Sequence, residues 1–334
     1  MQSARPRTGH ARRSYAARLT KPLVTVILPT RDRAEWIGRA IDSVLAQSYT
    51  RLELLVVDDG SRDATAQVLD RYADRLTVLS QAPAGVYAAR NRGMRHANGE
   101  LVAFMDSDDV WHRHRLAAQL ELIRRPEVGL VFGDAAHVRP GVRTASPART
   151  SFATTPPRQG RVAEHFAWGN FVPTITVLAR RSCLEEAGGF ATSHQLSADY
   201  LTWFRIALRH ELAYVPQVVA DYTVHGDGIS HDLGCALQAR IELFEEELER
   251  TSDPATRALI ERLLFVLGLH LALAAACGRA AAVQAPWATA RGCLAALPAR
   301  SRASASAHLV LRQAGIRARR RLGARLSGAF TTCY

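Results

Sequence analysis

Acidic residues are missing from both ends of this 334-residue chain. Asp32 is the first acid and Glu261 the last, and eleven arginines follow Glu261. The formal net charge of +12 therefore comes from the ends, while acids outnumber basic residues between them. Proteins that bind nucleic acid usually carry basic residues on the folded recognition surface, so we expect no nucleic-acid partner. Basic ends suit an anionic membrane surface. The alternative is a pair of solvated tails in an arginine-rich chain that has only one lysine.

Cysteines and long apolar runs are also scarce. The five cysteines are widely spaced and form no Cys-x-x-Cys pair. This spacing indicates neither a disulfide framework nor a zinc site, and it favours a reducing, cytoplasmic location. No apolar run follows the basic N-terminus before Pro22, so we expect no signal peptide. The longest apolar run, residues 263–277, is shorter than the ~20 residues that cross a bilayer. We expect it to form a buried helix.

Two common nucleotide-binding motifs are absent. No Gly-x-Gly-x-x-Gly follows the first predicted strand, and no Gly-x-x-x-x-Gly-Lys-Ser/Thr occurs in the chain. These absences argue against dinucleotide dehydrogenases and P-loop enzymes. The hydrophobic pattern nevertheless alternates between strands and helices, which predicts an α/β fold with a doubly wound, mostly parallel sheet. The expected strands are residues 23–28, 53–57, 76–79, 101–105, 128–132, 171–178 and 214–222, and the expected helices include 85–96 and 110–124.

An acidic cluster ends one of these strands. Residues 101–105 are apolar and are followed by Asp106, Asp108 and Asp109. Open α/β sheets bind their ligands at the carboxyl ends of the strands. Like charges this close raise one another's pKa unless a cation joins them, and carboxylates suit divalent cations such as Mg²⁺ and Mn²⁺. The cluster therefore favours a metal site, and the alternative is the N-cap of a helix that starts near Val110.

A second acid pair, Asp58 and Asp59, ends the strand predicted at residues 53–57. Because both acidic strand ends belong to one parallel sheet, we expect them at the same edge, where such folds bind nucleotides. The alternative is a turn in which Gly60 supplies a positive φ. A turn explains the glycine but does not require two acids.

With these acids in place, the chain resembles the family-2 glycosyltransferases of the glycosyltransferase-A fold over about residues 22–232. Each motif that carries the resemblance is weak by itself, but six occur in order. They are Val26-Ile27-Leu28-Pro29-Thr30, Val56-Val57-Asp58-Asp59-Gly60-Ser61, Ala89-Arg90-Asn91-Arg92-Gly93, Met105-Asp106-Ser107-Asp108-Asp109, Arg180-Arg181 to Gly188-Gly189-Phe190, and Asp199-Tyr200-Leu201-Thr202-Trp203.

The resemblance implies a nucleotide-sugar donor, with a UDP-sugar preferred, and an inverting transfer that uses Mn²⁺ or Mg²⁺. It implies that Asp59, with Asp58 beside it, accepts a hydrogen bond from the base and that Asp106 contacts the ribose. For Arg90, which is implied to reach the nucleotide, the alternative is a surface arginine. The residues implied in donor binding are Pro29, Thr30, Asp32, Asp58, Asp59, Arg90 and Asp106.

The resemblance also assigns a metal site and a catalytic base. Asp108 is implied to bind the metal, with Asp106 and His225 as further ligands. Asp199 is implied to deprotonate the acceptor hydroxyl on the face opposite the leaving group. The family commonly has Glu before this acid, whereas this chain has Ala198. The alternatives are a helix N-cap for Asp199 and an exposed loop residue for His225.

The acceptor side and the C-terminal part are less well defined. Trp168, Asn170 and Thr174 are expected to line a pocket for a glycan or lipid-linked acceptor, with core packing as the alternative for Trp168. We expect a cytoplasmic protein, bound at the inner face of the cell membrane if the basic ends contact lipid. The expected divisions are a disordered basic tail at residues 1–21, a catalytic domain at 22–234, and a helical region at 235–334 that ends in a basic tail.

Two other functions compete with an inverting glycosyltransferase of the hexosyltransferase type in cell-surface polysaccharide assembly. A sugar-phosphate nucleotidyltransferase would share the sheet and the acids, but it would carry a Gly- and Arg-rich loop after the first strand. This chain has Pro29-Thr30-Arg31-Asp32 there. A non-catalytic scaffold that binds nucleotide sugars would not require Asp108 or Asp199, and both are present.

Overall fold

A computed structural model describes residues 21–139, 149–151, 157–225 and 233–276. Within these residues, nine strands form one sheet in the order β3-β2-β1-β4-β8-β6-β9-β5, and β7 pairs with β6 at one side. The strands are β1 (Val24–Thr30), β2 (Leu52–Asp58), β3 (Thr77–Ser80), β4 (Leu101–Phe104), β5 (Val110–Trp111), β6 (Val128–Val138), β7 (Arg149–Thr150), β8 (Leu178–Arg180) and β9 (Glu211–Thr223).

The sheet is mostly parallel, as the alternation of strands and helices predicted. Strands β1, β2, β3 and β4 are parallel neighbours, and β6 is parallel to β9. The antiparallel strand β8 lies between β4 and β6, so both of these point the same way. The carboxyl ends of β1, β2 and β4 therefore meet at one edge, and the acids that follow β2 and β4 share it.

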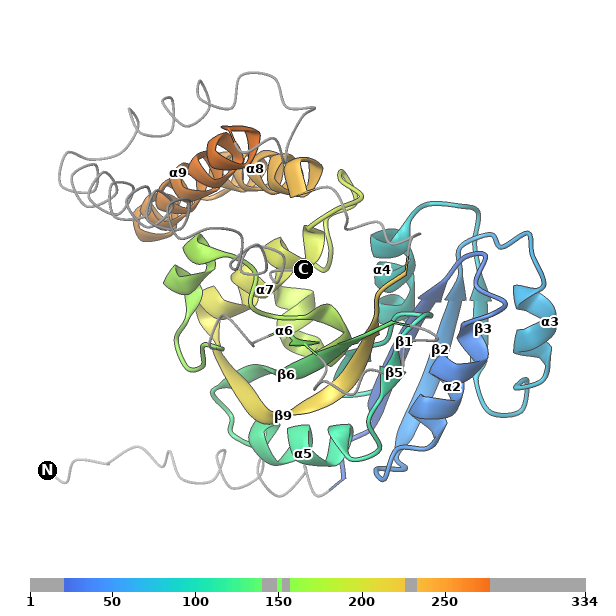
Figure 1. Cartoon of the computed structure of the whole chain (residues 1–334). Helices are drawn as coiled ribbons and strands as arrows, with labels where there is room; N and C mark the ends of the chain where they lie inside the picture. The colour runs from blue at the N-terminus through green and yellow to red at the C-terminus, as the bar shows by residue number, and fades with distance from the viewer. Residues whose placement is uncertain (1–20, 140–148, 152–156, 226–232, 277–334) are drawn as a thin grey trace, which may run out of the picture.

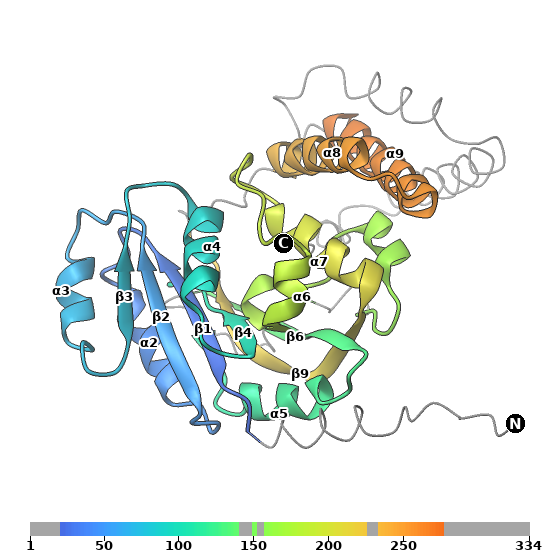
Figure 2. The same ribbon diagram turned by 180° about the vertical axis from the view of Figure 1, so that it is seen from behind.

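Helices cover both faces of the sheet (Figures 1 and 2). Along β1, Val26 and Leu28 are buried against one set of helices and Ile27 against the other. Burying such a side chain contributes about 1.5–3 kcal/mol. One face carries α2 (Ile37–Leu45), α3 (Thr65–Asp70) and α5 (Arg115–Ile123), and the other carries α4 (Val86–His96), α6 (Arg181–Glu186), α7 (Ala198–Arg209), α8 (Leu233–Arg250) and α9 (Pro254–Ala276).

Helix α4 lies unusually close to β1. A Cβ atom added at Gly93 would stand 2.5 Å from Ile27 Cγ2, which is closer than real Cβ contacts. Because Gly93 has no side chain, the helix backbone can rest on the strand. This contact determines how α4 is placed at the cavity described below.

Two of the expected elements are wrong in their bounds. Residues 174–176 form a 3₁₀ turn, η2 (Thr174–Thr176), and only the short strand β8 follows it. Pro173 has no N–H to donate to a strand ladder, and the carbonyl oxygens of Ile175 and Val177 accept hydrogen bonds from Arg115. The expected helix at residues 110–124 is also divided. Its start forms β5, which pairs with β9, and α5 begins at Arg115.

The C-terminal helices α8 and α9 pack on the rest of the described chain, above α7 in Figure 1. The Phe244 ring lies 5.1 Å from the Phe204 ring and 5.5 Å from the Tyr200 ring, measured between centroids. These helices therefore share a core with α7, and the division into domains at residue 234 stays a prediction. No helix among the described residues is both long enough and apolar enough to span a bilayer.

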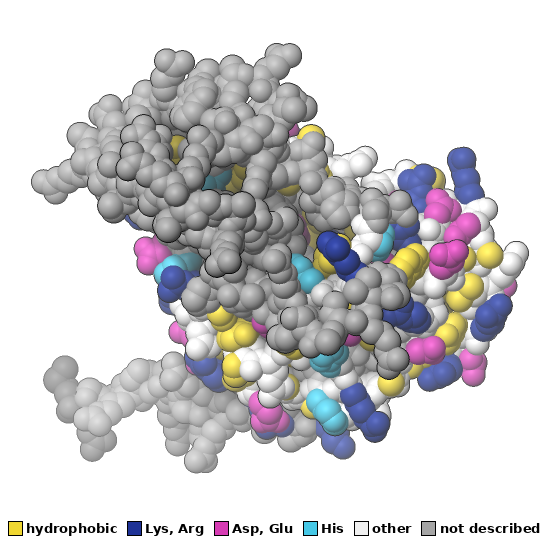
Figure 3. Space-filling model, in the orientation of Figure 1, with side chains coloured by type: hydrophobic (Ala, Val, Ile, Leu, Met, Phe, Trp, Pro, Cys, Tyr) yellow, Lys and Arg dark blue, Asp and Glu magenta, His cyan; other side chains and the backbone are white. Residues whose placement is uncertain are grey.

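The basic tail expected at residues 1–21 lies outside the described residues except for Lys21, and so does the helical region expected at 235–334 from residue 277 on. Figure 3 shows Lys and Arg side chains alternating with Asp and Glu over the end of the molecule formed by α2 and α3. The described surface there is mixed in charge, in agreement with the acidic balance of the middle of the sequence.

Arg115 is a buried cation that holds η2 in place. It is 1% exposed, and no carboxylate pairs with it among the described residues. Its guanidinium donates to the carbonyl oxygens of Ile175 and Val177 and lies 3.6 Å from the centroid of the Trp111 ring. Burial lowers the pKa of Arg115 well below its ordinary value. The site segment at residues 174–176 thus depends on a side chain from α5.

We predict that Arg115→Met lowers the free energy of unfolding by about 2–4 kcal/mol, because two buried carbonyl groups lose their donors. Urea denaturation followed by circular dichroism measures this loss. Arg124→Met, at the end of the same helix and 56% exposed, is the control and should change stability by less than ~0.5 kcal/mol. Equal stability of the two variants would contradict this role for Arg115.

Candidate functional site

A cavity of about 890 Å³ lies at the edge of the sheet where β1, β2 and β4 end. Among the described residues its wall comes from the ends of these strands, the start of α4, the η2 turn, the start of α7 and the end of β9. This is the position at which open α/β sheets bind ligands. The predicted residues that line it are Pro29, Thr30, Asp32, Asp59, Arg90, Asp106, Asp108, Asn170, Thr174, Asp199 and His225.

Asp106 forms an ion pair with a buried arginine. Its Oδ1 atom lies 2.6 Å from Nη2 of Arg90, which projects from α4 and is 5% exposed. Burial raises the pKa of Asp106, the Arg90 guanidinium opposes this, and the charge of Asp108 adds to it, so that the pKa stays above its ordinary value. Arg90 is therefore a cavity residue and not a surface arginine.

Asp108 gathers two further groups that carry or can carry positive charge. His225 Nε2 lies 2.9 Å from its Oδ2, and Arg33 Nε lies 3.7 Å from the same oxygen. The His225 ring stacks on Trp36 at 5.2 Å between centroids. His225 thus belongs to the cavity and not to an exposed loop, although residues 226–232 lie outside the described part of the chain. Arg33 was not predicted from the sequence, although it follows Thr30, the last residue of the β1 motif, by only three positions.

The helix-cap alternative for the acid cluster is wrong. Helix α5 begins at Arg115, its N-cap residue is His114, and no side chain caps it. Asp109 is buried, and its Oδ1 accepts the N–H of Thr223 at 2.7 Å, which ties β9 to the end of β4. Burial and the charges of Asp106 and Asp108 raise the pKa of Asp109 well above its ordinary value. The cluster therefore has an excess of negative charge that a cation would relieve.

The residues present fit a divalent cation. In an octahedral Mg²⁺ site with bonds of 2.0–2.1 Å, two neighbouring ligand atoms lie about 3 Å apart. Asp108 Oδ2 and His225 Nε2 have this spacing, since they are separated by 2.9 Å. Among the described residues no three His, Cys, Asp or Glu side chains form a complete metal site. Mg²⁺ is usually bound by one or two carboxylates together with substrate phosphates. Asp108, Asp106 and His225 are the residues that could hold it.

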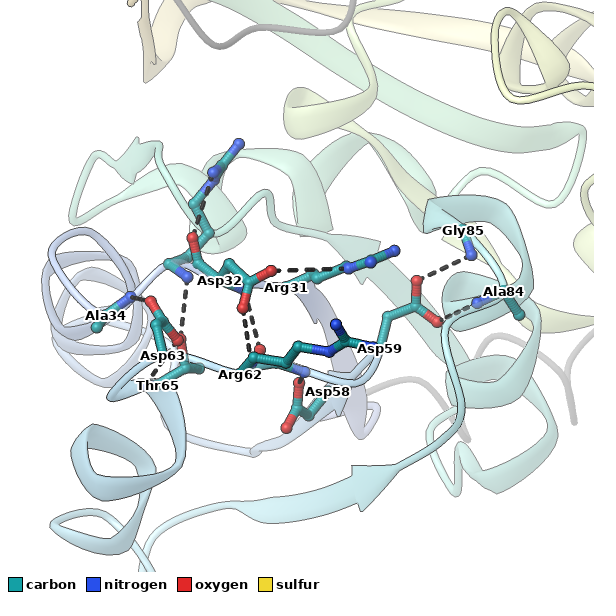
Figure 4. Close-up of polar contacts among 12 residues, drawn as sticks. Arg31, Asp32, Ala34, Asp58, Asp59, Arg62, Asp63, Thr65, Ala84 and Gly85 are labelled. Atoms are coloured by element: carbon teal, nitrogen blue, oxygen red, sulfur yellow. Dashed lines mark hydrogen bonds and ion pairs between the residues drawn. The ribbon is translucent and has the colours of Figure 1, made fainter.

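Asp58 and Asp59 point in different directions (Figure 4). Asp59 faces the start of α4, where its two oxygens accept the N–H groups of Ala84 and Gly85, each at 2.8 Å. Asp58 does not line the cavity, and its Oδ1 accepts the N–H of Ser61 at 2.9 Å. The turn alternative therefore describes Asp58, whereas Asp59 is a 4% exposed cavity residue that holds α4.

The end of β1 supplies the remaining polar groups on this side. Thr30 Oγ1 is buried and has no hydrogen-bond partner among the described residues. Asp32 has a positive φ of 50°, and its Oδ1 accepts the N–H of Arg62 at 2.7 Å. Thr30 thus offers an unused donor and acceptor to a ligand, while Asp32 joins the loops that follow β1 and β2.

Asp199 lies in the first turn of α7 and faces the cavity. Its Oδ1 accepts the hydroxyl of Tyr87 at 3.2 Å, and its Oδ2 accepts the hydroxyl of Thr174 at 2.7 Å. Both of these bonds come from side chains of other elements, so they give no support to a helix cap. Tyr87 was not predicted from the sequence. Its place three residues before Arg90, on the same face of a helix, was the available signal.

The expected acceptor residues are partly brought together. Asn170 and Thr174 line the cavity, and Asn170 Oδ1 accepts the N–H of Val172 at 3.0 Å. The Trp168 side chain lies outside what the structure describes. Arg240 of α8 also reaches this side, where its Nε donates to Ser197 Oγ at 3.1 Å.

Comparison with protein families and known proteins gives consistent matches. Residues 25–187 match the family model described as glycosyl transferase family 2. The UDP-Glc:alpha-D-GlcNAc-diphosphoundecaprenol beta-1,3-glucosyltransferase WfgD of Escherichia coli is 36% identical over 114 residues, which are 34% of this chain and 45% of WfgD. The chain spans less than two thirds of the length of the leading curated relatives, between 42% and 65%.

Solved structures share the fold over most of the chain. TarS of Staphylococcus aureus, residues 1–349, superposes with a TM-score of 0.62 and 21% identity, covering 83% of this chain and 82% of TarS. The mannosyltransferase PcManGT of Pyrobaculum calidifontis, solved with GDP-Man and Mn²⁺, gives a TM-score of 0.55 and 28% identity. It covers 87% of this chain and 85% of PcManGT. The fold is the glycosyltransferase-A fold.

We predict that Asp59→Asn lowers the free energy of unfolding by about 1–3 kcal/mol, because an amide NH₂ then faces one of the buried N–H donors at the start of α4. Urea denaturation measures the loss. Asp58→Asn is the matched control, since its remaining oxygen can still accept the N–H of Ser61. If Asp58→Asn is as destabilising as Asp59→Asn, then Asp59 has no special part in holding α4.

Proposed function

Because residues 25–187 form a glycosyl transferase family 2 domain, we propose that the protein is an inverting hexosyltransferase. It moves a sugar from a nucleotide-diphosphate donor to a hydroxyl of a glycan or glycolipid acceptor in cell-surface polysaccharide assembly. The observation that carries this proposal is that Asp106, Asp108 and Asp199 line one cavity. Such a cavity can bind a charged donor beside an acceptor hydroxyl.

The proposed step transfers one proton and exchanges one bond. Asp199 accepts the proton of the acceptor hydroxyl, the acceptor oxygen forms a bond to the anomeric carbon, and the bond from that carbon to the diphosphate oxygen breaks. Attack from the face opposite the leaving group inverts the configuration. The nucleoside diphosphate leaves with the bonding electrons.

Positive charge is needed where the diphosphate leaves. A bound Mn²⁺ or Mg²⁺ would offset the charge that develops there, and Asp108, Asp106 and His225 would hold it. Arg33 and Arg90 already lie at this side, within 3.7 Å of Asp108 and 2.6 Å of Asp106. Their guanidinium groups suit phosphate oxygens, which they can bind with paired hydrogen bonds.

A UDP-sugar is the proposed donor. The name of WfgD specifies UDP-Glc, and TarS has been solved with UDP-GlcNAc. PcManGT, solved with GDP-Man and Mn²⁺, supports a divalent metal and keeps a GDP-sugar as the alternative. The nucleobase of the donor would contact the residues near Asp59 and Thr30, and its ribose would contact Asp106.

We predict that a UDP-sugar with Mn²⁺ raises the melting temperature in a thermal-shift screen of UDP-, GDP- and dTDP-sugars. A ligand at 100 times its Kd stabilises a protein by about 2.7 kcal/mol. Asp108→Asn should lose the metal-dependent part of the shift in melting temperature.

Asp199→Asn should keep this shift but lower the rate of transfer by about 10²–10⁴-fold, because only the general base is removed. Absence of any metal-dependent response to the three donor classes would refute the proposal, and unchanged transfer by Asp199→Asn would remove Asp199 from the base role.

We also propose a cytoplasmic location at the inner face of the membrane, supported by the basic charge of both ends of the sequence. The full chain should sediment with vesicles that contain phosphatidylglycerol and not with pure phosphatidylcholine vesicles. About 1 M NaCl should release it, because the Debye length falls to about 3 Å. Equal binding to both kinds of vesicle would contradict an electrostatic anchor.

A further inference from the structure

The Asp199 carboxylate is held at both oxygens by side chains from two other elements. Tyr87 of α4 donates its hydroxyl to Oδ1, and Thr174 of η2 donates its hydroxyl to Oδ2, at 3.2 and 2.7 Å. The three residues are far apart in the sequence and meet at the wall of the cavity. A carboxylate held at one oxygen can still turn about its bond to Cβ, whereas donors at both oxygens fix its plane.

The Tyr87 donor is itself fixed. Its side chain is buried, and its ring stacks on Phe190 at 5.7 Å between centroids. The Arg90 guanidinium lies 5.5 Å from the centroid of the same ring. Burial and the charge of Asp199 raise the pKa of Tyr87, so the hydroxyl keeps its proton and remains a donor at neutral pH.

The Thr174 donor is fixed through the backbone that carries it. Arg115 donates to the carbonyl oxygens of Ile175 and Val177, and Gln119 donates to that of Thr176 at 2.6 Å. Both of these side chains come from α5, on the other face of the sheet. The η2 turn therefore has little freedom to move, and the Thr174 hydroxyl stays where the carboxylate requires it.

We propose that Tyr87 and Thr174 are positioning residues for the transfer reaction. They fix the Asp199 carboxylate in one orientation. The carboxylate lone pairs that accept no hydrogen bond from Tyr87 or Thr174 then face the cavity and the acceptor hydroxyl. The inference rests on the proposed function, since it assigns no role to these residues unless Asp199 is the base. Neither residue needs to touch the reacting atoms, because each acts through Asp199.

Helix α4 adds a second part to this inference. Tyr87 and Arg90 are three residues apart, so they lie on one side of the helix. One binds the proposed base and the other binds Asp106 on the donor side. The same rigid element thus sets the distance between the base and the donor-binding acid, and misplacement by 1 Å can cost about 100-fold in rate.

The test compares Tyr87→Phe and Thr174→Val with wild type at saturating donor and acceptor. Each variant should lower kcat by about 10–100-fold while the KM of the acceptor and the Kd of UDP change by less than about threefold. Thr174→Ser keeps the hydroxyl and should recover most of the activity lost in Thr174→Val. Tyr72→Phe is the matched control, because the Tyr72 hydroxyl also donates to a carboxylate, that of Asp42 at 3.0 Å, outside the cavity.

Wild-type kcat in Tyr87→Phe and Thr174→Val would overturn the inference, as would a Thr174→Ser variant as impaired as Thr174→Val. A loss of kcat that simply follows a loss of unfolding free energy in all variants, Tyr72→Phe included, would assign these residues a structural role only. Asp199→Asn distinguishes a failure of the positioning role from a failure of the proposed function. If it is inactive while Tyr87→Phe has wild-type kcat, the proposed function stands and the positioning role fails. If it transfers at the wild-type rate, the base assignment fails first.

Discussion

Crowded negative charge at one edge of the sheet is the constraint on which the rest of the site depends. Asp106, Asp108 and Asp109 stand within four positions at the end of β4, and burial together with the neighbouring negative charges raises the pKa of Asp106 and of Asp109. Each is compensated by a different part of the chain. Arg90 comes from α4, His225 follows β9, and the backbone N–H that binds Asp109 belongs to β9 itself. The three acids thus bind side-chain and backbone groups of the elements that enclose the cavity.

A second set of contacts relates the two halves of this cavity. Asp59 holds the start of α4 through two backbone N–H groups, and α4 then presents Arg90 toward Asp106 and Tyr87 toward Asp199. If a nucleobase binds at Asp59, as we propose, it contacts a carboxylate that already orients the helix. Donor binding and the placement of Asp199, the proposed catalytic base, would then be related through the same short helix.

The sequence predicted what depends on local pattern. The parallel sheet, the acids at the ends of β2 and β4, and the place of Asp199 at the start of a helix all follow from strand ends and motif order. Tyr87, Arg33 and Arg115 could not be predicted in the same way. Helical spacing could have placed Tyr87 beside Arg90, but the roles of all three depend on hydrogen bonds and ion pairs to residues 60 to 112 positions away.

The strand wrongly expected at residues 171–178 also results from contacts between distant parts of the chain. Residues 171–178 read as a strand because they are apolar and β-branched, but their carbonyl groups bind Arg115, and Pro173 interrupts the ladder. Asp58 and Asp59 look equivalent in the sequence, yet β2 ends at Asp58 and the two side chains point in different directions (Figure 4). Only Asp59 reaches the cavity, while Asp58 binds the turn at Ser61.

The contact between Gly93 and Ile27 has a consequence for how the site tolerates change. The helix rests directly on the strand because residue 93 has no side chain. A methyl group there would meet the Ile27 side chain, so α4 would have to shift against β1, and Tyr87 and Arg90 would shift with it relative to Asp199 and Asp106. Under the function we propose, acceptor activation and donor binding would then change together, since both depend on the position of one helix.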